Sequence, residues 1–500
     1  MRASASAAGY LAGWLLVAVS STVANTALAE YAEPLRYHRD AVLGTSLDVS
    51  VYGAKRSAAD AAVRRMEREL ERLEAVLSTY RSDSELSRAN RAGKLAPASS
   101  DLLAVLRLCE QWRERSAERF SCRMGRVIAY WDEAQRSQQA PDRVAVRALA
   151  WRANRAELVQ PPQAVVLPEP VELAPDGLAK GYIIDRLAQV LRRALPGAAF
   201  KLDIGGDAIY EGRPPGRAGW DVGLADPVAT ADNGGFIGQL RLSSRAIAAS
   251  GHHSRSRHIG KREYSHILQP RDGWPVADAP AAVVVADDAV TADAVATALA
   301  ASTLAEGIDW VNTLEGVEAL VIGPQGRQLA SANWAALVSG GDNRGGEQAA
   351  NLRLRYELPR LAVAEYHPPY VSIWISNGER QTVKNLLLLG ESERWAKENR
   401  RWWRKVGRRD PTLLDGIARP TRSPGVYDLV WDGRDDFGRP LPTGDYTLHL
   451  EASREAGGTA YRQIPFVWGG AATEYNAAAQ GEFGDIHLQV YAGAPVAPAS

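Results

Sequence analysis

Residues 176–207 read DGLAKGYIIDRLAQVLRRALPGAAFKLDIGGD, a predicted helix followed closely by a predicted strand. The helical pattern runs from about Gly181 to Leu195, and Pro196-Gly197 ends it. The next run, Phe200–Ile204, has the composition of a strand and stops at a Gly-Gly turn. A helix joined to a strand by so short a turn indicates mixed α and β structure.

The same mixture extends on both sides of that stretch. Amphipathic or apolar periodicity predicts helices at 57–77, around 102–112 and at 291–302. Residues 145–173 are interrupted by prolines and are expected to be irregular. Short β-like runs are predicted at 220–224, 239–242, 246–249, 281–286 and 317–322. Because helices and strands do not alternate regularly, the predicted class is α+β.

The composition is that of an ordinary globular protein. Of 500 residues, 46% are hydrophobic and 24% are charged, and this length suits two or three domains. Lys and Arg together number 59, as do Asp and Glu. This balance gives no overall field that would attract nucleic acid, so no nucleic-acid partner is expected.

The first 29 residues have the pattern of a signal peptide. An apolar stretch from Ala7 to Ala24 follows Arg2, and Ala27-Leu28-Ala29 is a small-x-small cleavage pattern. Cleavage after Ala29 predicts an exported protein, with the periplasm as the expected location. The alternative is an uncleaved leader that tethers the chain to a membrane, although the apolar run is short and is broken by polar residues 20–22.

Only two cysteines occur, Cys109 and Cys122. An oxidising compartment would permit a disulfide between them, but spacing alone does not show that their Cα atoms lie close enough. Two buried free thiols are the alternative, with equal weight.

The character of the sequence changes after residue 338. Residues 341–357 begin Gly-rich and polar, and we interpret them as a linker between a first domain at 34–340 and a second at 358–495. Alternating runs in the second domain predict an all-β, immunoglobulin-like sandwich, with strands at 370–376, 427–431, 446–450 and 486–490. Two interpretations remain open for Trp395, Trp402 and Trp403, which either form a binding face with neighbouring basic residues or cap the sandwich.

Two glycine-containing stretches in the first domain suit a nucleotide. Asp176–Gly181 opens a helix and contains Lys180, and a helix N-terminus with a cation and permissive glycines suits phosphate. Gly205-Gly206-Asp207 follows a strand, and a Gly-Gly pair allows close approach to a flat ligand. Taken singly, each is equally well explained as a plain helix start or a tight turn.

Two further groups contain residues capable of chemistry. His252 and His253 follow Ser250-Gly251, and His266 lies between Ser265 and Ile267, where it could act as a general acid or base. Asp293 and Thr297 are four residues apart on a predicted helix, so a carboxylate and a hydroxyl share one face and suit Mg²⁺. The structural alternatives are ordinary surface or core histidines, and an Asp and a Thr that stabilise their own helix.

In order and spacing, these groups resemble the successive motifs of the FAD:protein FMN transferases, the ApbE family. The resemblance covers roughly residues 38–340. The stretches that carry it are Ser78–Ser87, Ala179–Tyr182, Gly205–Asp207, Ser250-Gly251, Ser265–Ile267, and Ala292-Asp293 with Thr297.

The resemblance implies an Mg²⁺-dependent enzyme that uses FAD as substrate and transfers FMN to a Thr or Ser hydroxyl of a target flavoprotein, with release of AMP. An inner-membrane redox complex is a further candidate partner. The implied metal site consists of Gly177 (through its backbone carbonyl), Asp293, Ala296 and Thr297. The implied catalytic residues are His266 and Asp293. The implied FAD-binding residues are Leu43, Tyr80, Ser121, Cys122, Arg123, Ala174, Lys180, Gly205, Gly206, His266 and Ile267.

Some positions depart from the family pattern. Ser121-Cys122-Arg123 stands where the family commonly has Asp-x-Thr, Ala174 stands at a position usually occupied by Asp, and Gln269 also replaces an Asp. Leu43 replaces a usual Met. Because carboxylates are lost around the implied FAD pocket, the alternative is a periplasmic protein that binds or hydrolyses FAD without transferring FMN.

The C-terminal part resembles a small periplasmic domain of unknown function. The resemblance is carried by Thr421–Gly425, Trp431-Asp432-Gly433, Asp435–Gly438 and Gly444-Asp445-Tyr446, which are interpreted as structural residues or as part of a protein-binding module. Asp415–Thr421 keeps the first and last residues of the acceptor pattern that flavin-accepting proteins carry. Because Arg419 and Pro420 stiffen that stretch, Thr421 is predicted not to be modified.

Overall fold

The computed structural model describes residues 34–158, 161–225, 236–251, 256–276, 280–323 and 326–339, and most of 352–491. Within that last range, the residues not described are 362, 364–366, 391–395, 409–417, 420, 423, 437–439 and 456. The expected signal peptide, His252, His253, Trp395 and most of the acceptor-like stretch therefore lie outside the described residues. The chain forms two compact units, one from residues up to 221 together with 241–337, the other from 222–240 together with residues from 338 onward.

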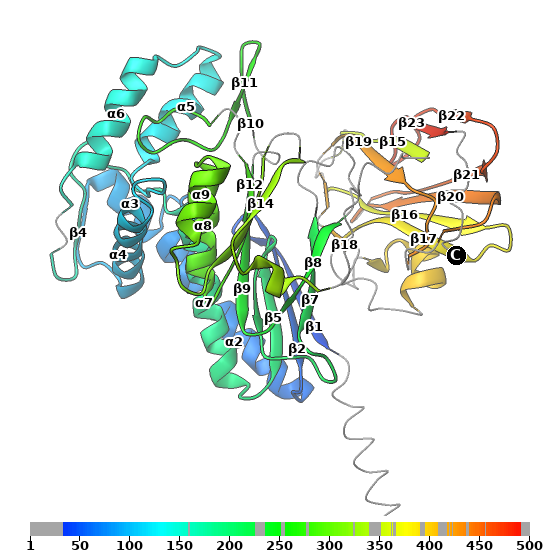
Figure 1. The fold of residues 1–500 in the computed structure, drawn as a ribbon, viewed down its shortest axis with the longest axis horizontal. Coiled ribbons are helices and arrows are strands. Elements are labelled where there is room, and N and C mark those ends of the chain that lie inside the picture. The colour runs from blue at the N-terminus through cyan, green and yellow to red at the C-terminus, as the bar shows by residue number, and fades with distance from the viewer. Residues whose placement is uncertain are drawn as a thin grey trace, which may run out of the picture. The chain divides into compact units, whose positions relative to one another are not determined.

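An eight-stranded antiparallel sheet forms the centre of the first unit (Figure 1). Its strand order is β1-β2-β5-β6-β9-β12-β13-β14, and each neighbouring pair is antiparallel. β12 is buried along its whole length, which explains its unbroken apolar sequence. The bounds of the strands are β1 Leu35–Val42, β2 Thr45–Tyr52, β5 Ala199–Ile204, β6 Asp207–Glu211, β9 Arg245–Ser250, β12 Ala281–Ala286, β13 Glu318–Ile322 and β14 Gln328–Ala330.

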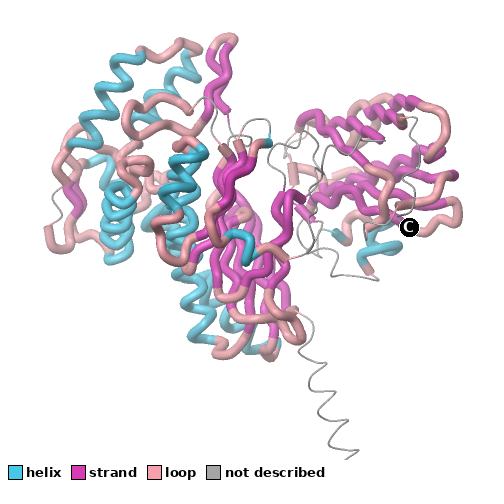
Figure 2. The backbone as a smooth tube through the Cα atoms, in the orientation of Figure 1, coloured by secondary structure: helices cyan, strands magenta, loops and turns pink. Residues whose placement is uncertain are grey.

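Helices α2 (Arg56–Leu77), α7 (Asp176–Ala194) and α8 (Ala289–Ala300) pack together and against this sheet (Figure 2). They share one core with it, in which Met66, Leu70 and Leu73 of α2 are fully buried. The predicted helices are confirmed, but α7 begins five residues earlier than expected. The Asp176–Gly181 stretch is therefore helical. The remaining helices of this core are α3 Glu85–Ala92, α4 Ser100–Arg115 and α9 Leu304–Val311.

The expectation of irregular structure at 145–173 is wrong in its first part. Residues 125–155 form α5 (Gly125–Ser137) and α6 (Arg143–Arg155). Both helices share a small separate core with the hairpin of β10 (Ser256–Ile259) and β11 (Arg262–Ser265). Trp131 lies at its centre, fully buried, and its indole N–H donates to the carbonyl of Gly273 at 2.9 Å. The signal was weak because small residues such as Ala150 and Ala153 form much of the buried face of α6.

Shorter pairings complete the list of elements outside the two main cores. β3 (Lys94–Leu95) pairs with β4 (Val165–Val166), and β7 (Trp220–Ala225) pairs with β8 (Phe236–Leu242). A 3-10 turn covers Trp334–Leu337. Within the part of the chain that the structure describes, no helix combines the length and apolar character needed to cross a membrane.

The second unit is all β, as predicted. A four-stranded sheet (β19-β15-β23-β22) and a five-stranded sheet (β18-β17-β16-β20-β21) contribute to one hydrophobic core. The immunoglobulin-like arrangement of these strands stays a prediction. The strand bounds are β15 Leu352–Leu358, β16 Tyr370–Asn377, β17 Thr382–Leu389, β18 Ala418–Arg419, β19 Gly425–Trp431, β20 Gly444–Ser453, β21 Thr459–Trp468, β22 Thr473–Ala477 and β23 Ile486–Val490.

The structure corrects the bounds of the predicted linker and decides the role of Trp402. The expected linker at 341–357 is too long, because its last residues form β15, which pairs with β19 and β23. Trp402, in the short helix α11 (Arg400–Trp402), is fully buried and donates its indole N–H to Asn385 at 2.8 Å. Trp402 therefore caps the five-stranded sheet rather than offering a binding face.

Candidate functional site

The residues implied for the metal lie where α7 and α8 touch. A Cβ atom at Gly181 would lie 2.3 Å from the carbonyl oxygen of Ala289, so only glycine permits this approach of the two helices. The Gly181 N–H donates to Oδ2 of Asp293 at 3.0 Å, and the Thr297 hydroxyl donates to the carbonyl of Gly177 at 3.3 Å. The structure thus brings Gly177, Asp293 and Thr297 close together at this helix contact; their role as metal ligands stays a prediction.

Ala296 belongs to the same helix, but its methyl side chain has no atom that can bind a metal ion. It is buried between Asp293 and Thr297 on α8, where it fills the interior. It can therefore contribute to a metal site only through its backbone or by leaving room.

A partly buried carboxylate fixes the N-terminus of α8. Asp185, on α7, accepts hydrogen bonds from the N–H groups of Ala289 and Val290, each at 2.9 Å. Burial raises the pKa of Asp185 to about 6, although the two N–H groups oppose that shift. These bonds satisfy orphan donors of the helix and hold α8 in register with α7.

A second carboxylate, Asp207, lies in the same cluster. Its Oδ2 is 2.7 Å from the Lys180 ammonium, and its Oδ1 accepts from the N–H of Ala249 at 3.1 Å. Only 3% of Asp207 is exposed. Burial raises the pKa of the Asp293 carboxyl to about 7, and the negative charge of Asp207 adds to the effect. Sequence reasoning did not assign Asp207, although it completes the Gly205-Gly206-Asp207 motif.

The donor set at the helix contact fits Mg²⁺. It consists of oxygens from a carbonyl, a carboxylate and a hydroxyl, and Mg²⁺ binds such ligands while keeping several waters. Among the described residues no group of three His, Cys, Asp or Glu side chains is placed to hold a metal, so a site here depends on this mixed set. A nearby cation would also stabilise the charged form of the buried Asp293 carboxylate, whose pKa burial raises toward neutrality.

The Gly205-Gly206 turn lies against the turn between β1 and β2. The N–H of Gly205 donates to the carbonyl of Ser46 at 3.2 Å, and a Cβ atom at Gly205 would lie 2.6 Å from a methyl carbon of Thr45. Leu43, at the start of the β1–β2 turn, adopts a left-handed backbone with φ of 49°. The Gly205-Gly206 turn therefore lies beside the first residues of β2, which follow the turn that contains Leu43.

Tyr80 lies in a loop tied to the start of α7. The Thr79 hydroxyl donates to Oδ1 of Asp176 at 2.9 Å, which places this loop beside the first turn of the helix. The Tyr80 side chain is 78% exposed. An exposed aromatic ring at this position is available to a ligand.

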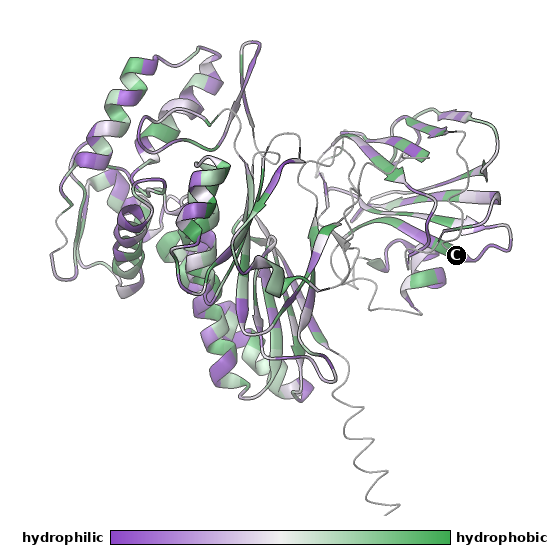
Figure 3. Ribbon diagram, viewed as in Figure 1, coloured by the Kyte–Doolittle hydropathy of each residue, from purple (hydrophilic) through white to green (hydrophobic). Residues whose placement is uncertain are grey.

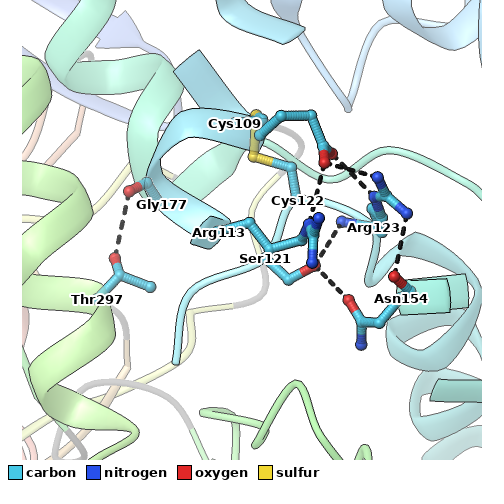
Figure 4. The surroundings of a disulfide bond; sticks show 9 residues. Cys109, Arg113, Ser121, Cys122, Arg123, Asn154, Gly177 and Thr297 are labelled. Atoms are coloured by element: carbon cyan, nitrogen blue, oxygen red, sulfur yellow. Dashed lines mark hydrogen bonds and ion pairs between the residues drawn. A yellow bond between two sulfur atoms is a disulfide. The ribbon is translucent and has the colours of Figure 1, made fainter. Parts of the chain in front are cut away.

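Cys109 and Cys122 form a disulfide, with Cα atoms 5.7 Å apart, which settles the open question of their state (Figure 4). The carbonyl of Cys122 accepts from the N–H of Ala174 at 2.7 Å. Ala174 is the second residue before α7, so the disulfide supports the segment that leads to Gly177. The Cys122 thiol is consumed by this bond.

The side chains of Ser121 and Arg123, on either side of Cys122, also form bonds within the protein. Arg123 is 4% exposed, pairs with Glu110 at 2.6 Å and donates to the carbonyls of Ala153, Asn154 and Ala156. The Ser121 hydroxyl donates to Asn154 at 2.7 Å. These side chains attach the 121–123 loop to α6 (Figure 4). The side chains of Cys122 and Arg123 are thus engaged in bonds within the protein, and the FAD-binding role implied for these residues stays a prediction.

His266 and Ile267 lie at the far end of α8. Ile267 is buried against Ala300 and Ala301, one turn beyond Thr297, and its N–H donates to the Ser265 hydroxyl oxygen at 3.1 Å. The carbonyl of Ile267 receives the N–H of Val276 at 3.0 Å. His266 is half-buried. The packing of Ile267 thus fixes His266 next to the helix that carries Asp293 and Thr297.

Comparison with known proteins finds a family model for each part of the chain. A model of the ApbE family matches residues 43–321, and one described as predicted periplasmic protein (DUF2271) matches residues 351–485. A FAD:protein FMN transferase of Treponema pallidum is 28% identical over 339 residues, covering 64% of this chain and 91% of the relative. One from Klebsiella pneumoniae is 25% identical over 260 residues, covering 51% and 79%.

Two solved structures share the fold of the first unit. The ApbE protein of Thermotoga maritima aligns with a TM-score of 0.55 at 22% identity, over 62% of this chain and 100% of that one. The flavinyl transferase ApbE of Pseudomonas stutzeri aligns with a TM-score of 0.54 at 20% identity, over 62% and 98%. Since the family model covers more than half of the sequence, this chain belongs to the ApbE family.

Proposed function

We propose that the chain is an exported enzyme that, with Mg²⁺, transfers FMN from FAD to a Thr or Ser hydroxyl of a target flavoprotein and releases AMP. The observation that carries the proposal is the contact between α7 and α8, which gathers the Gly177 carbonyl, Asp293, the Thr297 hydroxyl and the Lys180–Asp207 pair. The names of the related proteins support the same reaction.

In this reaction the acceptor hydroxyl oxygen forms a bond to the phosphorus on the riboflavin side of the FAD pyrophosphate. The bond from that phosphorus to the bridging oxygen breaks, and the bridging oxygen leaves with AMP. The hydroxyl proton passes to a base, for which we propose His266. Mg²⁺ held by Gly177, Asp293 and Thr297 would neutralise charge on the phosphate oxygens.

The other residues are proposed to bind FAD. Lys180 provides a cation beside the pyrophosphate, and the paired turns at Leu43 and Gly205-Gly206 provide a surface free of bulky side chains for the flavin nucleotide. Exposed Tyr80 offers a ring for stacking. Ser121, Ala174 and Ile267 are proposed to border the pocket. Cys122 and Arg123 support it from the protein side.

The location is proposed to be the periplasm. The leader pattern of residues 1–29 favours export, and the match of the second unit to a predicted periplasmic family supports it. The disulfide between Cys109 and Cys122 suits an oxidising compartment. A role of the second unit in docking the target protein or an inner-membrane redox complex belongs to the same proposal.

One incubation distinguishes the possible activities. The protein is mixed with FAD, Mg²⁺ and a flavin-accepting protein, and the products are separated by gel electrophoresis and chromatography. Covalent flavin on the acceptor together with AMP supports the proposal. Free FMN and AMP without covalent flavin would identify an FAD hydrolase, and unchanged FAD bound to the protein would identify a binder.

A further inference from the structure

The outward side of α6 combines exposed apolar residues with arginines. Val144 is 77% exposed and Trp151 is 58% exposed, both high for residues of this size. Val144, Ala148 and Trp151 follow one another at helical spacing and form a ridge along the helix. Exposed Arg147 and Arg152 lie on either side of that ridge. We call these five residues the α6 ridge; Figure 3 shows hydrophobic and hydrophilic bands alternating along this helix.

The charge of this helix is of one sign. α6 contains Arg143, Arg147, Arg152 and Arg155, with no Asp or Glu between them. Within the described part of the chain, neither Arg147 nor Arg152 forms an ion pair or a side-chain hydrogen bond. Because the whole chain balances 59 basic against 59 acidic residues, this helix concentrates positive charge locally. Arg155 is set aside, since it also lines a cavity of about 720 Å³ together with Glu114 and Glu157, a volume within the usual range for ligand pockets.

The opposite side of the helix is firmly held. Val146 and Ala150 are fully buried in the small core around Trp131. The amide of Asn154 donates to the carbonyl of Pro270 at 2.6 Å, and Arg123 holds the carbonyls at the C-terminal end of the helix. The ridge is therefore preformed, and binding to it need not order the backbone.

We propose that the α6 ridge binds an anionic phospholipid surface. Tryptophan favours the interface between water and lipid, and arginines beside it would meet lipid phosphates. A basic residue close to an anionic membrane contributes about fivefold in affinity. The ridge lies along the outside of one helix and carries charge of one sign, which suits a planar layer of headgroups better than the mixed surface of a protein partner. This proposal does not depend on the flavin reaction.

A fluorescent label on the ridge tests the proposal directly. Both native cysteines are in the disulfide, so Ala148→Cys adds the only free thiol of the chain and can carry an environment-sensitive dye. We expect the dye emission to shift to the blue with vesicles that contain phosphatidylglycerol, and not with pure phosphatidylcholine. High salt should reverse the shift, because exposed charges are then screened.

Matched charge reversals show which residues are responsible. Arg147→Glu with Arg152→Glu should weaken vesicle affinity by about 25-fold or more, from about fivefold for each lost arginine. The control is Arg65→Glu with Arg68→Glu on α2, where the same charge change on exposed arginines should have much less effect. Trp151→Ala should weaken binding and reduce the dye shift. Unchanged near-ultraviolet circular dichroism confirms that each variant is folded.

Three results would overturn the proposal. The control pair could weaken binding as much as the ridge pair, which would indicate a general charge effect. The chain could bind vesicles while the dye at position 148 stays in water, so that another segment makes the contact. Finally, the dye could respond to a polyglutamate peptide and not to vesicles, which would identify an acidic protein as the partner.

Discussion

Nζ of Lys180 lies 2.7 Å from Oδ2 of Asp207, and among the described residues this is the ion pair that Lys180 makes. Burial lowers the pKa of Lys180, but the negative charges of Asp207 and Asp293 outweigh burial and raise it. The Lys180 ammonium is therefore charged, and it pairs with Asp207 rather than with Asp293. Asp293 remains available for a cation.

Replacing Asp207 by Asn should weaken Mg²⁺ binding. Lys180 would lose its partner and would pair with Asp293, in competition with the metal. We expect a loss of about tenfold in Mg²⁺ affinity, the effect of one pKa unit of electrostatic interaction. Calorimetric titration with Mg²⁺ in the absence of FAD measures it. The double variant Asp207→Asn/Lys180→Met should recover most of the affinity, and unchanged affinity in the single variant would refute the competition.

Replacing Asp293 should remove turnover without unfolding the protein. Burial raises the pKa of the Asp293 carboxyl from 3.8 to about 7. Asp293 therefore destabilises the metal-free folded protein progressively as the pH rises from about 4 to about 7, because the unfolded chain loses this proton first. The metal-free Asp293→Asn variant should therefore melt at or above the wild-type temperature at pH 8. Mg²⁺ should raise the melting temperature of the wild type more at pH 8 than at pH 6, and should not raise that of the variant.

The exposed, ion-paired Asp221 supplies a matched control for Asp293. Asp221→Asn should keep both activity and the Mg²⁺-dependent rise in melting temperature. Full FMN transfer by Asp293→Ala at the wild-type Mg²⁺ requirement would contradict the metal assignment.

His266→Ala should slow transfer more than it weakens FAD binding. Loss of a general base typically costs about 10²–10⁴-fold in rate. Single-turnover kinetics and a fluorescence titration with FAD separate the two quantities. If both fall by the same factor, His266 is a binding residue, and the base must be sought elsewhere.

Removing the disulfide should destabilise the first unit. The bond joins residues 13 positions apart, and closing a loop of that size contributes about 3 kcal/mol in chain-entropy estimates. Cys109→Ser/Cys122→Ser should therefore lower the melting temperature of the first unit. A reductant should lower the wild-type melting temperature and leave that of the variant unchanged. Equal sensitivity of both proteins would show that the bond does not stabilise the fold.

The second unit should lose stability in acid because of His449. This ring is 2% exposed, stacks on Trp374 and interacts with Ser376 and Tyr461 at 2.8 Å. Burial lowers its pKa from 6.5 to about 4, so the unfolded chain takes up the proton first as pH falls. Stability present above pH 6.5 is lost progressively toward pH 4, by about 3 kcal/mol.

Differential scanning calorimetry between pH 7 and pH 4 tests the role of His449. The transition that shifts in His449→Gln identifies the unfolding of the second unit. That transition should depend less on pH in the variant than in the wild type. The same pH dependence in both would assign the acid sensitivity to other groups.

The elements with strong periodicity could be predicted from the sequence. The buried face of α2 is predicted by the helical spacing of Met66, Leu70 and Leu73. The unbroken apolar run of β12 is typical of a strand buried on both faces. The resemblance to the ApbE family also selected Gly177, Asp293 and Thr297. Local spacing was sufficient for α2 and β12 because each signal lies within one helix or strand.

Other features depended on contacts between distant segments. Small buried residues give α6 a weak pattern, and β15 lies within the predicted linker because its strand structure depends on pairing with β19 and β23. The ion pair of Asp207 depends on Lys180, which lies on α7, far from it in the sequence. The hydrogen bonds of Arg123 to carbonyls at the end of α6 likewise join segments about 30 residues apart.

The sequence by itself determined the α+β class of the first part and the all-β character of the second, because these follow from periodicity within short stretches of chain. The tertiary structure alone decided the state of Cys109 and Cys122, the partner of Lys180 and the exposure of Trp151. Each of these depends on distances between segments that the sequence does not specify, and both electrostatic interaction and burial change steeply with such distances.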